Sequence, residues 1–131
     1  MTPTETVGPY PSLVDLFRSD IRAGKTGTLL TLTIHVVTFT TIYPGWYQGR
    51  ATHIHVEMTM AGRSVKVTQI AFPESINNSV HASGVYASRG TNPMSNLSDG
   101  IFSDSLSSEI VTPSGSVSAG YAATFQVAIS A

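Results

Sequence analysis

The 131-residue sequence contains no cysteine, few charged residues and no long apolar run. Without cysteine it can form neither disulfide bonds nor thiolate metal sites. Only 11% of the residues are charged and the net charge is −1, so neither nucleic acid nor an anionic membrane surface is an expected partner. The apolar run 29–39 is interrupted by threonines and is too short to span a bilayer. The sequence is nevertheless 41% hydrophobic, which is enough for the core of a single domain over residues 1–131.

Signals for export are also sparse. Met1 is followed directly by polar residues, with neither a basic start nor an apolar segment, so the sequence predicts no signal peptide. Two N-glycosylation sequons, at Asn77 and Asn96, would indicate secretion. The indication is weak, because such matches often arise by chance in a serine-rich sequence. The sequence therefore leaves the cellular compartment undetermined.

Short β-rich segments separated by turn residues predict an all-β fold, an antiparallel β-sandwich with a short helix and long loops. The expected strands are 28–37, continued as extended chain over 38–43, then 53–60 and 64–72 as a hairpin, and finally 107–112 and 117–130 around a turn at 113–115. A short helix is expected over 74–83, with Ser75 as its N-cap, followed by a loop over 84–104.

The stretch 43–56, YPGWYQGRATHIHV, concentrates aromatic, basic and metal-ligating side chains. His53 and His55 are two residues apart on an expected strand, which puts both imidazoles on one face, about 6–7 Å apart along the strand. Two imidazoles so placed can bind one metal ion, and neutral imidazole suits iron, copper, zinc and nickel alike. A polar sheet face is the alternative, and an isolated His-x-His pair indicates it more often.

Tyr47 lies just before this strand, across a Gln48-Gly49 bend. A bound trivalent cation would lower the pKa of a phenol from its usual value of about 10 and favour the tyrosinate. Tyrosinate oxygen is a hard ligand, and together with imidazole it suits ferric iron. The alternative is an aromatic ring that packs while its hydroxyl stays exposed, and for Tyr43 this alternative is the preferred one.

Other residues near the histidine pair leave two interpretations open. Arg50 could stabilise negative charge on a bound aromatic substrate, or it could be a solvated loop cation. Gln69, on the partner strand, could hydrogen-bond to a ligand or substrate, or be an ordinary polar strand residue. Trp46 is equally compatible with packing and with a pocket wall. His35 is expected at the edge of the core and not as a ligand.

The segment 44–56 resembles the iron-binding signature of the intradiol ring-cleavage dioxygenases, and it is most similar to the fungal extracellular-type branch. The similarity covers nearly the whole chain. It includes the segments 6–10, 18–22, 27–37, 68–72 and 121–129, and the loop residues Tyr86, Asn96, Asp99 and Phe102.

This resemblance implies a β-sandwich that binds a non-haem ferric iron, Fe(III), through two tyrosines and two histidines. Tyr47 matches one tyrosine ligand, His53 and His55 match the histidine ligands, and Arg50 and Gln69 match catalytic positions near the substrate. The implied activity is the intradiol cleavage of a catechol-type aromatic diol by O2, as in aromatic compound catabolism. The implied partners are the diol, O2 and, in a homodimer, a second copy of the chain. The resembling branch is often secreted.

The sequence departs from the family at the join between Val37 and Thr38, where a long family segment is missing. That segment carries the second tyrosine ligand. Tyr10, Tyr43, Tyr86 and the distant Tyr121 are the available substitutes, and none of them lies in a matching motif.

Three hypotheses follow. The protein is an active or residually active dioxygenase, or it is a truncated, non-catalytic β-sandwich that retains weak iron binding. A third hypothesis is a carbohydrate-binding module with Trp46 and Tyr47 as its stacking platform, but this does not account for His53 and His55.

Overall fold

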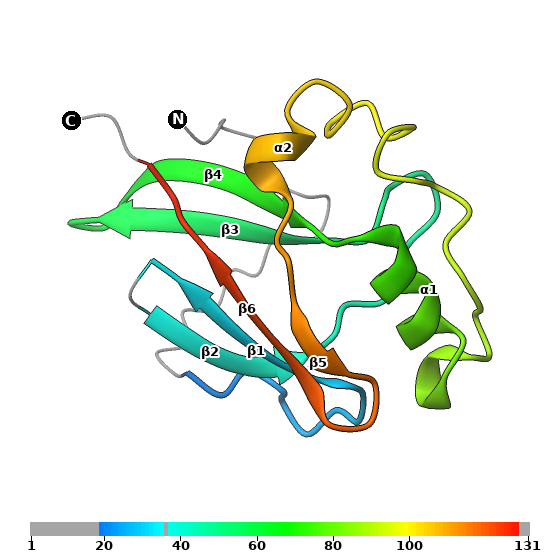
Figure 1. Ribbon diagram of the computed structural model, residues 1–131. Coiled ribbons are helices and arrows are strands. Elements are labelled where there is room, and N and C mark those ends of the chain that lie inside the picture. Colours follow the sequence, from blue (N-terminus) through cyan, green and yellow to red (C-terminus); the bar gives the residue numbers. More distant parts are fainter. Residues whose placement is uncertain (1–18, 36, 129–131) are drawn as a thin grey trace.

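The computed structural model describes residues 19–35 and 37–128, which form two sheets packed face to face (Figure 1). The elements in order are β1 (Leu29–Ile34), β2 (Val37–Ile42), β3 (His53–Met60), β4 (Arg63–Ala71), α1 (Glu74–His81), the 3₁₀ turn η1 (Gly84–Tyr86), α2 (Leu106–Glu109), β5 (Ser114–Ser116) and β6 (Gly120–Phe125). The first sheet has the strand order β2-β1-β6-β5, and the second consists of β3 and β4. The prediction of an all-β sandwich with a short helix and long loops is confirmed.

One strand pair in the first sheet is parallel, which the sequence did not predict. β1 pairs with β2 and β5 pairs with β6 in antiparallel fashion, whereas β1 and β6 run parallel from the Leu30–Tyr121 pair to the Ile34–Phe125 pair. Parallel neighbours need a long connection. Here the whole second sheet and both helices lie in the chain between β1 and β6.

The segment predicted as one extended run over 28–43 is a tight hairpin. β1 and β2 pair along their full length, closing with Ile34 opposite Val37. His35 makes the turn possible by adopting a positive φ of 59°. Such turns usually carry glycine, asparagine or aspartate, so the histidine concealed this one from the sequence analysis. His35 is exposed in the turn, and the prediction that it lies at the core edge is wrong.

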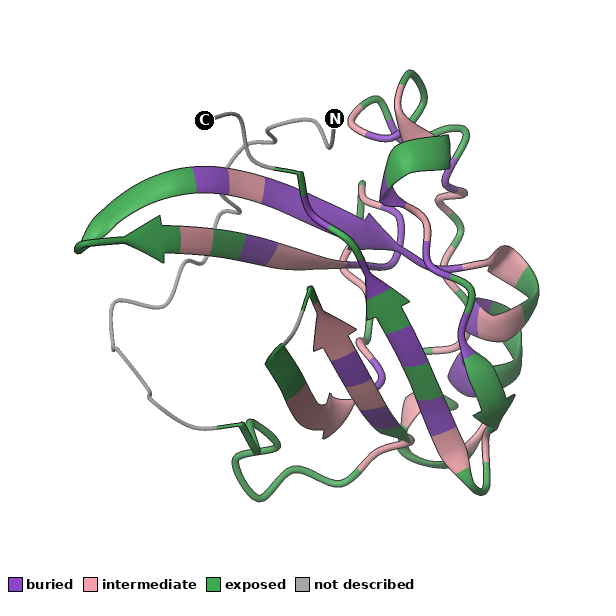
Figure 2. Cartoon of the chain, turned by 60° about the vertical axis from the view of Figure 1, so that its left-hand side comes forward, coloured by how far each residue is buried: buried purple, intermediate pink, exposed green. Residues whose placement is uncertain are grey.

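The hairpin predicted over 53–72 is confirmed as β3–β4. Ala61 and Gly62 have φ values of 50° and 75°, so both turn residues are left-handed, as the twist of a two-residue hairpin requires. The two ends of this hairpin differ in environment, because β4 is exposed near the turn and buried toward Ala71 (Figure 2). The residues that begin β3 and end β4 therefore lie in the protected half of the molecule.

The core fills the space between the sheets. Buried and exposed residues alternate along β6, so that one of its faces contributes Tyr121, Ala123 and Phe125 to the core (Figure 2). Leu30 of β1 and Ile70 of β4 belong to the same cluster, and both are fully buried. The two sheets are thus held together mainly by apolar side chains of alternating strand residues.

Three predictions for local structure are wrong. Part of the predicted strand 107–112 is helix α2, and only Ile110 forms a bridge, to Ala71. The predicted turn at 113–115 includes the start of β5, and the chain instead reverses over 117–119. Pro73, not Ser75, occupies the N-cap of α1. Proline is favourable there because it needs no hydrogen-bond partner for a backbone N–H.

Both sequon asparagines are structural. The side chains of Asn77 and Asn96 are buried, and each donates a hydrogen bond to the carbonyl oxygen of Phe72. Asn77 also accepts a 2.8 Å hydrogen bond from the hydroxyl of Tyr43. A glycan on either amide would be incompatible with this packing.

Separately, none of the helices in the described residues has the length and apolar character to cross a membrane.

Tyr43→Phe should lower the free energy of unfolding by about 1–3 kcal/mol, because it leaves the buried side-chain oxygen of Asn77 without its donor. The matched control is Tyr121→Phe. Tyr121 lies in the same core cluster, but its hydroxyl makes no hydrogen bond within the described residues. Chemical denaturation of the two variants measures the difference, and equal losses of stability would contradict the structural role of the Tyr43 hydroxyl.

Candidate metal centre

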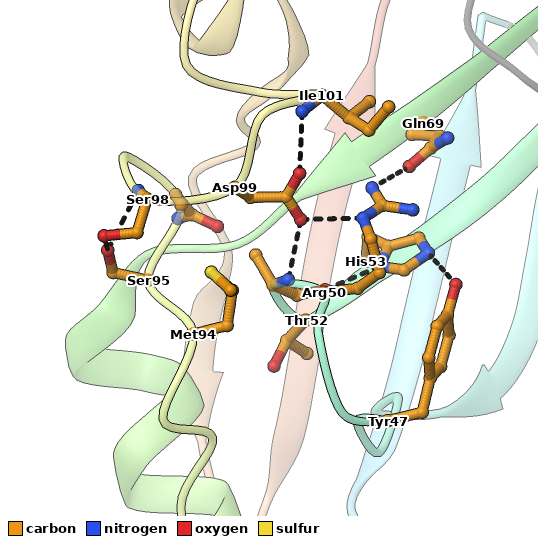
Figure 3. A network of polar contacts seen from close by, with 12 residues as sticks. Tyr47, Arg50, Thr52, His53, Gln69, Met94, Ser95, Ser98, Asp99 and Ile101 are labelled. Carbon is orange, nitrogen blue, oxygen red and sulfur yellow. Dashed lines mark hydrogen bonds and ion pairs between the residues drawn. The ribbon is translucent and has the colours of Figure 1, made fainter.

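Three side chains from the signature segment converge at the start of β3. Figure 3 shows two of them, Tyr47 and His53. The Nε2 atoms of His53 and His55 are 3.0 Å apart, and the hydroxyl oxygen of Tyr47 lies 3.3 Å from Nε2 of His53. The strand period of two brings the imidazoles together. The turn at residues 48–50 carries the chain from Tyr47 back to β3. The three residues predicted as metal ligands are therefore neighbours in space.

The backbone fixes the orientation and the tautomer of His53. Its Nδ1 atom donates a 2.6 Å hydrogen bond to the carbonyl oxygen of Ala51, which leaves the lone pair of Nε2 directed toward His55 and Tyr47. The pKa of His53 is lowered to about 4, mainly by burial and further by the nearby charge of Arg50 and by His55, against the opposing effect of the Ala51 bond. His53 is thus neutral at pH 7, the form that binds metals.

The spacing of these donor atoms fits a single metal ion. Two ligands bound at about 2.1 Å and at right angles to each other lie about 3 Å apart, close to the separations seen here. Within residues 19–35 and 37–128, no group of three or more histidine, cysteine, aspartate or glutamate side chains could hold a metal. The phenol oxygen of Tyr47 is the further donor atom beside the two imidazoles that could complete such a set, and two imidazoles with one phenolate would suit ferric iron.

The other tyrosines of the described residues point elsewhere. The hydroxyl of Tyr43 is engaged in the core, so the prediction of an exposed Tyr43 hydroxyl is wrong. The hydroxyl of Tyr86 donates a 2.7 Å hydrogen bond to the carbonyl oxygen of Tyr43. Tyr121 packs in the core with its ring centroid 5.9 Å from that of Tyr43. Tyr10 lies outside the described residues. Tyr47 is thus the one tyrosine of the described chain that meets the histidine pair.

Arg50 and Gln69 lie beside the histidine pair and contact each other (Figure 3). Nη2 of Arg50 donates a 2.5 Å hydrogen bond to Oε1 of Gln69, which is fully buried and pairs with His55 across the β3–β4 ladder. The guanidinium carbon lies 5.7 Å from the ring centroid of Phe102. Only 18% of the Arg50 side chain is exposed, so the interpretation of Arg50 as a solvated loop cation is wrong.

Asp99 holds Arg50 and the adjacent backbone in place, and sequence reasoning identified it only as part of the family resemblance. Its Oδ2 atom accepts hydrogen bonds from Nε of Arg50 at 2.8 Å and from the backbone N–H of Ala51 at 2.7 Å. Its Oδ1 atom accepts a bond from the N–H of Ile101 at 2.8 Å. Burial alone would raise the pKa of Asp99, but these donors outweigh it and hold the pKa below its usual value.

Asn92, in the same long loop, is a residue that sequence reasoning missed altogether. Its side-chain amide donates to the carbonyl oxygen of Arg50 at 2.9 Å and to the hydroxyl of Thr52 at 3.2 Å. Asn92 and Asp99 are each 40 or more positions from their partners in the signature segment. No local pattern reveals contacts of that separation, so only the folded chain shows that this loop braces the site.

Trp46 packs against the same long loop. Its Nε1 atom donates a 2.8 Å hydrogen bond to the carbonyl oxygen of Gly90, and the guanidinium carbon of Arg89 lies 4.2 Å from the ring centroid. These contacts favour the packing interpretation of Trp46. They also make a cation–π contact that helps to hold the loop against the signature segment.

A hollow of about 660 Å³ lies between β1, β2 and β3 and borders His55. Its lining is mostly apolar and includes Leu32, Phe39, Ile54 and Met58, and His55 is one of its polar lining residues. Small-molecule sites are typically hollows of roughly 300–1,000 Å³ with apolar walls and a few polar groups. An apolar ring of modest size therefore has room beside His55.

Comparison with known proteins gives matches among solved structures alone, since neither a family model nor a curated protein matches the sequence. An intradiol ring-cleavage dioxygenase from Tetranychus urticae has a TM-score of 0.84 at 21% identity, covering 98% of this chain and 93% of that chain. The dioxygenase Tetur07g02040 has a TM-score of 0.87 at 20% identity, with the same coverage.

A third similar structure is the dioxygenase domain of a dioxygenase carbohydrate-binding protein fusion from the cellulolytic bacterium Streptomyces sp. SirexAA-E. Its TM-score is 0.63 at 20% identity, covering 95% of each chain. At this level of identity the three likenesses establish the fold. The chain adopts the β-sandwich fold found in these dioxygenases.

In the metal-free protein, His53 should make the stability depend on pH. Its pKa is about 4 when folded, against about 6.5 in an unfolded chain, so between these pH values only the unfolded state binds the proton. The free energy of unfolding should therefore fall as the pH is lowered from 7 to 5. His53→Asn should reduce that fall by up to about 2 kcal/mol, measured by denaturant titration with chelator present.

The matched control is His35→Asn, which removes the exposed histidine of the β1–β2 turn. If this control loses as much of the pH dependence as His53→Asn, the assignment of the effect to the buried imidazole is wrong.

Proposed function

We propose that this protein is a member of the intradiol ring-cleavage dioxygenase family that cleaves catechol-type aromatic diols with O2 at a non-haem ferric iron. The observation that carries the proposal is the convergence of Tyr47, His53 and His55, with donor atoms 3.0 and 3.3 Å apart. This donor set lies on a fold shared with solved dioxygenases. Neither the carbohydrate-binding hypothesis nor the hypothesis of a non-catalytic β-sandwich gains support from a specific contact.

The surroundings of the three proposed ligands suit an anionic aromatic substrate. Arg50 places a positive charge beside His53, where it can stabilise the negative charge of an ionised diol. The apolar hollow next to His55 can accept an aromatic ring. Gln69 anchors Nη2 of Arg50 and so has a positioning role in this proposal.

In the proposed reaction, Tyr47, His53 and His55 hold the iron, and the remaining residues control the substrate. Ferric iron, when bound, would supply activation of the ionised diol ring toward O2. The neutral state of His53 at pH 7 keeps its Nε2 lone pair available for metal binding. Arg50 binds and orients the anionic diol, and Phe102 shields one side of the guanidinium group.

We further propose that a family segment carrying the second tyrosine ligand is absent at the Val37–Thr38 join. The join lies at the start of β2, one residue pair beyond the turn that closes the β1–β2 hairpin. The tyrosines of the described residues support the proposal, because Tyr47 alone among them meets the histidine pair. With three protein ligands, iron affinity and activity should be lower than with four. Membership of the fungal extracellular-type branch and a homodimer remain parts of this proposal.

Iron binding can be tested by colour. Reconstitution of the wild-type protein with ferric iron should give a visible tyrosinate-to-iron charge-transfer band, and Tyr47→Phe should abolish it, because Tyr47 is the one described tyrosine at the histidine pair. Tyr121→Phe is the control and should keep the band, because Tyr121 packs in the core. A folded protein that stays colourless and free of iron after reconstitution would refute the iron site.

Activity requires a separate measurement. The iron-loaded protein should consume O2 in the presence of catechol and give a ring-opened diacid. Arg50→Gln should lower kcat/KM by about 10-fold to 100-fold, because a charge-assisted hydrogen bond contributes about 1.5–3 kcal/mol. Absence of O2 uptake in a folded, coloured sample would instead favour the hypothesis of a non-catalytic β-sandwich with iron binding.

A further inference from the structure

We propose that Asp99 is a positioning residue of this site, and that it holds the guanidinium group of Arg50 in the orientation that binds an anionic oxygen of the substrate. The inference rests on the proposed function and adds to it a residue from the long loop over 84–104. It is carried by the contacts of one buried carboxylate, whose side chain is 1% exposed.

The Asp99 carboxylate fixes a side chain and the backbone at once. Oδ2 accepts from Nε of Arg50 and from the N–H of Ala51, which are consecutive residues, while Oδ1 accepts from Ile101 in its own loop. Because the carboxylate is buried and held by three donors, it cannot rotate without losing hydrogen bonds that water does not replace. Ala51 in turn accepts the Nδ1 hydrogen bond of His53. Asp99 is therefore two hydrogen bonds from a proposed iron ligand.

The orientation of Arg50 follows from these contacts. A guanidinium group is planar, so fixing two of its three nitrogens fixes the direction of the third. Asp99 holds Nε, at 2.8 Å, and Gln69 holds Nη2, at 2.5 Å. Nη1 makes no hydrogen bond with any residue that the structure describes, so it has donors to offer a ligand. The ring of Phe102 lies against the group at 5.7 Å and further restricts it.

The charges agree with this role. The single negative charge of Asp99 balances the positive charge of Arg50, so the pair is neutral as a whole while the guanidinium edge remains positive. That edge lies close enough to His53 for Arg50 to lower the pKa of the imidazole. Without Asp99, the guanidinium group would be free to rotate toward solvent, since 18% of the side chain is already exposed. Arg50 would then keep its positive charge, but the charge would no longer lie beside the bound substrate.

The test compares Asp99→Asn with Asp104→Asn, which removes an exposed carboxylate from the same loop. In iron-loaded protein, Asp99→Asn should weaken catechol binding by about 10-fold or more, followed through the shift of the charge-transfer band. Its iron content should stay at the wild-type level, because the ligands Tyr47, His53 and His55 are retained. Asp104→Asn should bind catechol as the wild type does.

A double-mutant cycle shows whether Asp99 acts through Arg50. In an Arg50→Gln background, Asp99→Asn should cause no further loss of catechol affinity. Arg50→Lys should weaken catechol binding in a similar way to Asp99→Asn, because an ammonium group keeps the charge but lacks the planar fork. Equal losses from Asp99→Asn with and without Arg50 would overturn the proposal, as would wild-type affinity in Asp99→Asn.

A measurement without iron or substrate separates this inference from the proposed function. In a ¹⁵N–¹H NMR spectrum of the metal-free protein, the Nε–H signal of Arg50 should be shifted and protected from solvent exchange by its bond to Asp99. Arg50→Lys identifies the signal by removing it. Asp104→Asn should preserve the signal, and Asp99→Asn should abolish its protection. An unprotected Nε–H in the wild type would overturn the positioning role, whereas a protected one in a protein that binds no iron would refute the proposed function alone.

Discussion

The hydrogen bonds to the Asp99 carboxylate connect the two parts of the chain on which the site depends. The signature segment carries all three proposed ligands, yet by itself it is a loop that enters a strand. The contacts of Asp99 with Arg50 and Ala51 attach this segment to a loop almost fifty positions away. Because the carboxylate is excluded from water, these bonds do not compete with solvent as surface ion pairs do. The rigid placement of His53 and Arg50 is a consequence.

The sequence was informative where structure depends on neighbours in the chain. The alternation of His53 and His55 on a strand, and the left-handed turn at Ala61-Gly62, follow from local geometry, and both are present. The turn at His35 escaped prediction because a histidine occupies a backbone conformation that other residues favour. The segment 107–112 has strand-like composition, but it packs against β4 as a helical turn followed by a single β-bridge.

The bracing of the site lay beyond local reasoning for a different physical reason. Asn92 and Asp99 occur in a polar loop whose composition predicts only irregular structure. Their importance comes from burial, which is a property of the folded molecule. Gln69 likewise could be placed on its strand from the sequence, but its contact with Arg50 depends on a loop conformation. The sequence could therefore suggest chemical roles for individual residues, whereas the hydrogen bonds that orient these residues could be found only in the structure.

The parallel pairing of β1 with β6 also has a consequence for how the protein is made. β1 is synthesised well before its neighbour β6, which is the last of the described elements. The first sheet therefore cannot close until almost the whole described chain has been synthesised. Until then, one edge of β1 offers unpaired backbone groups to any other strand nearby. The edge of β1 is thus open to mispairing while the segment between β1 and β6 is synthesised, and the completed sandwich removes that hazard only at its final strand.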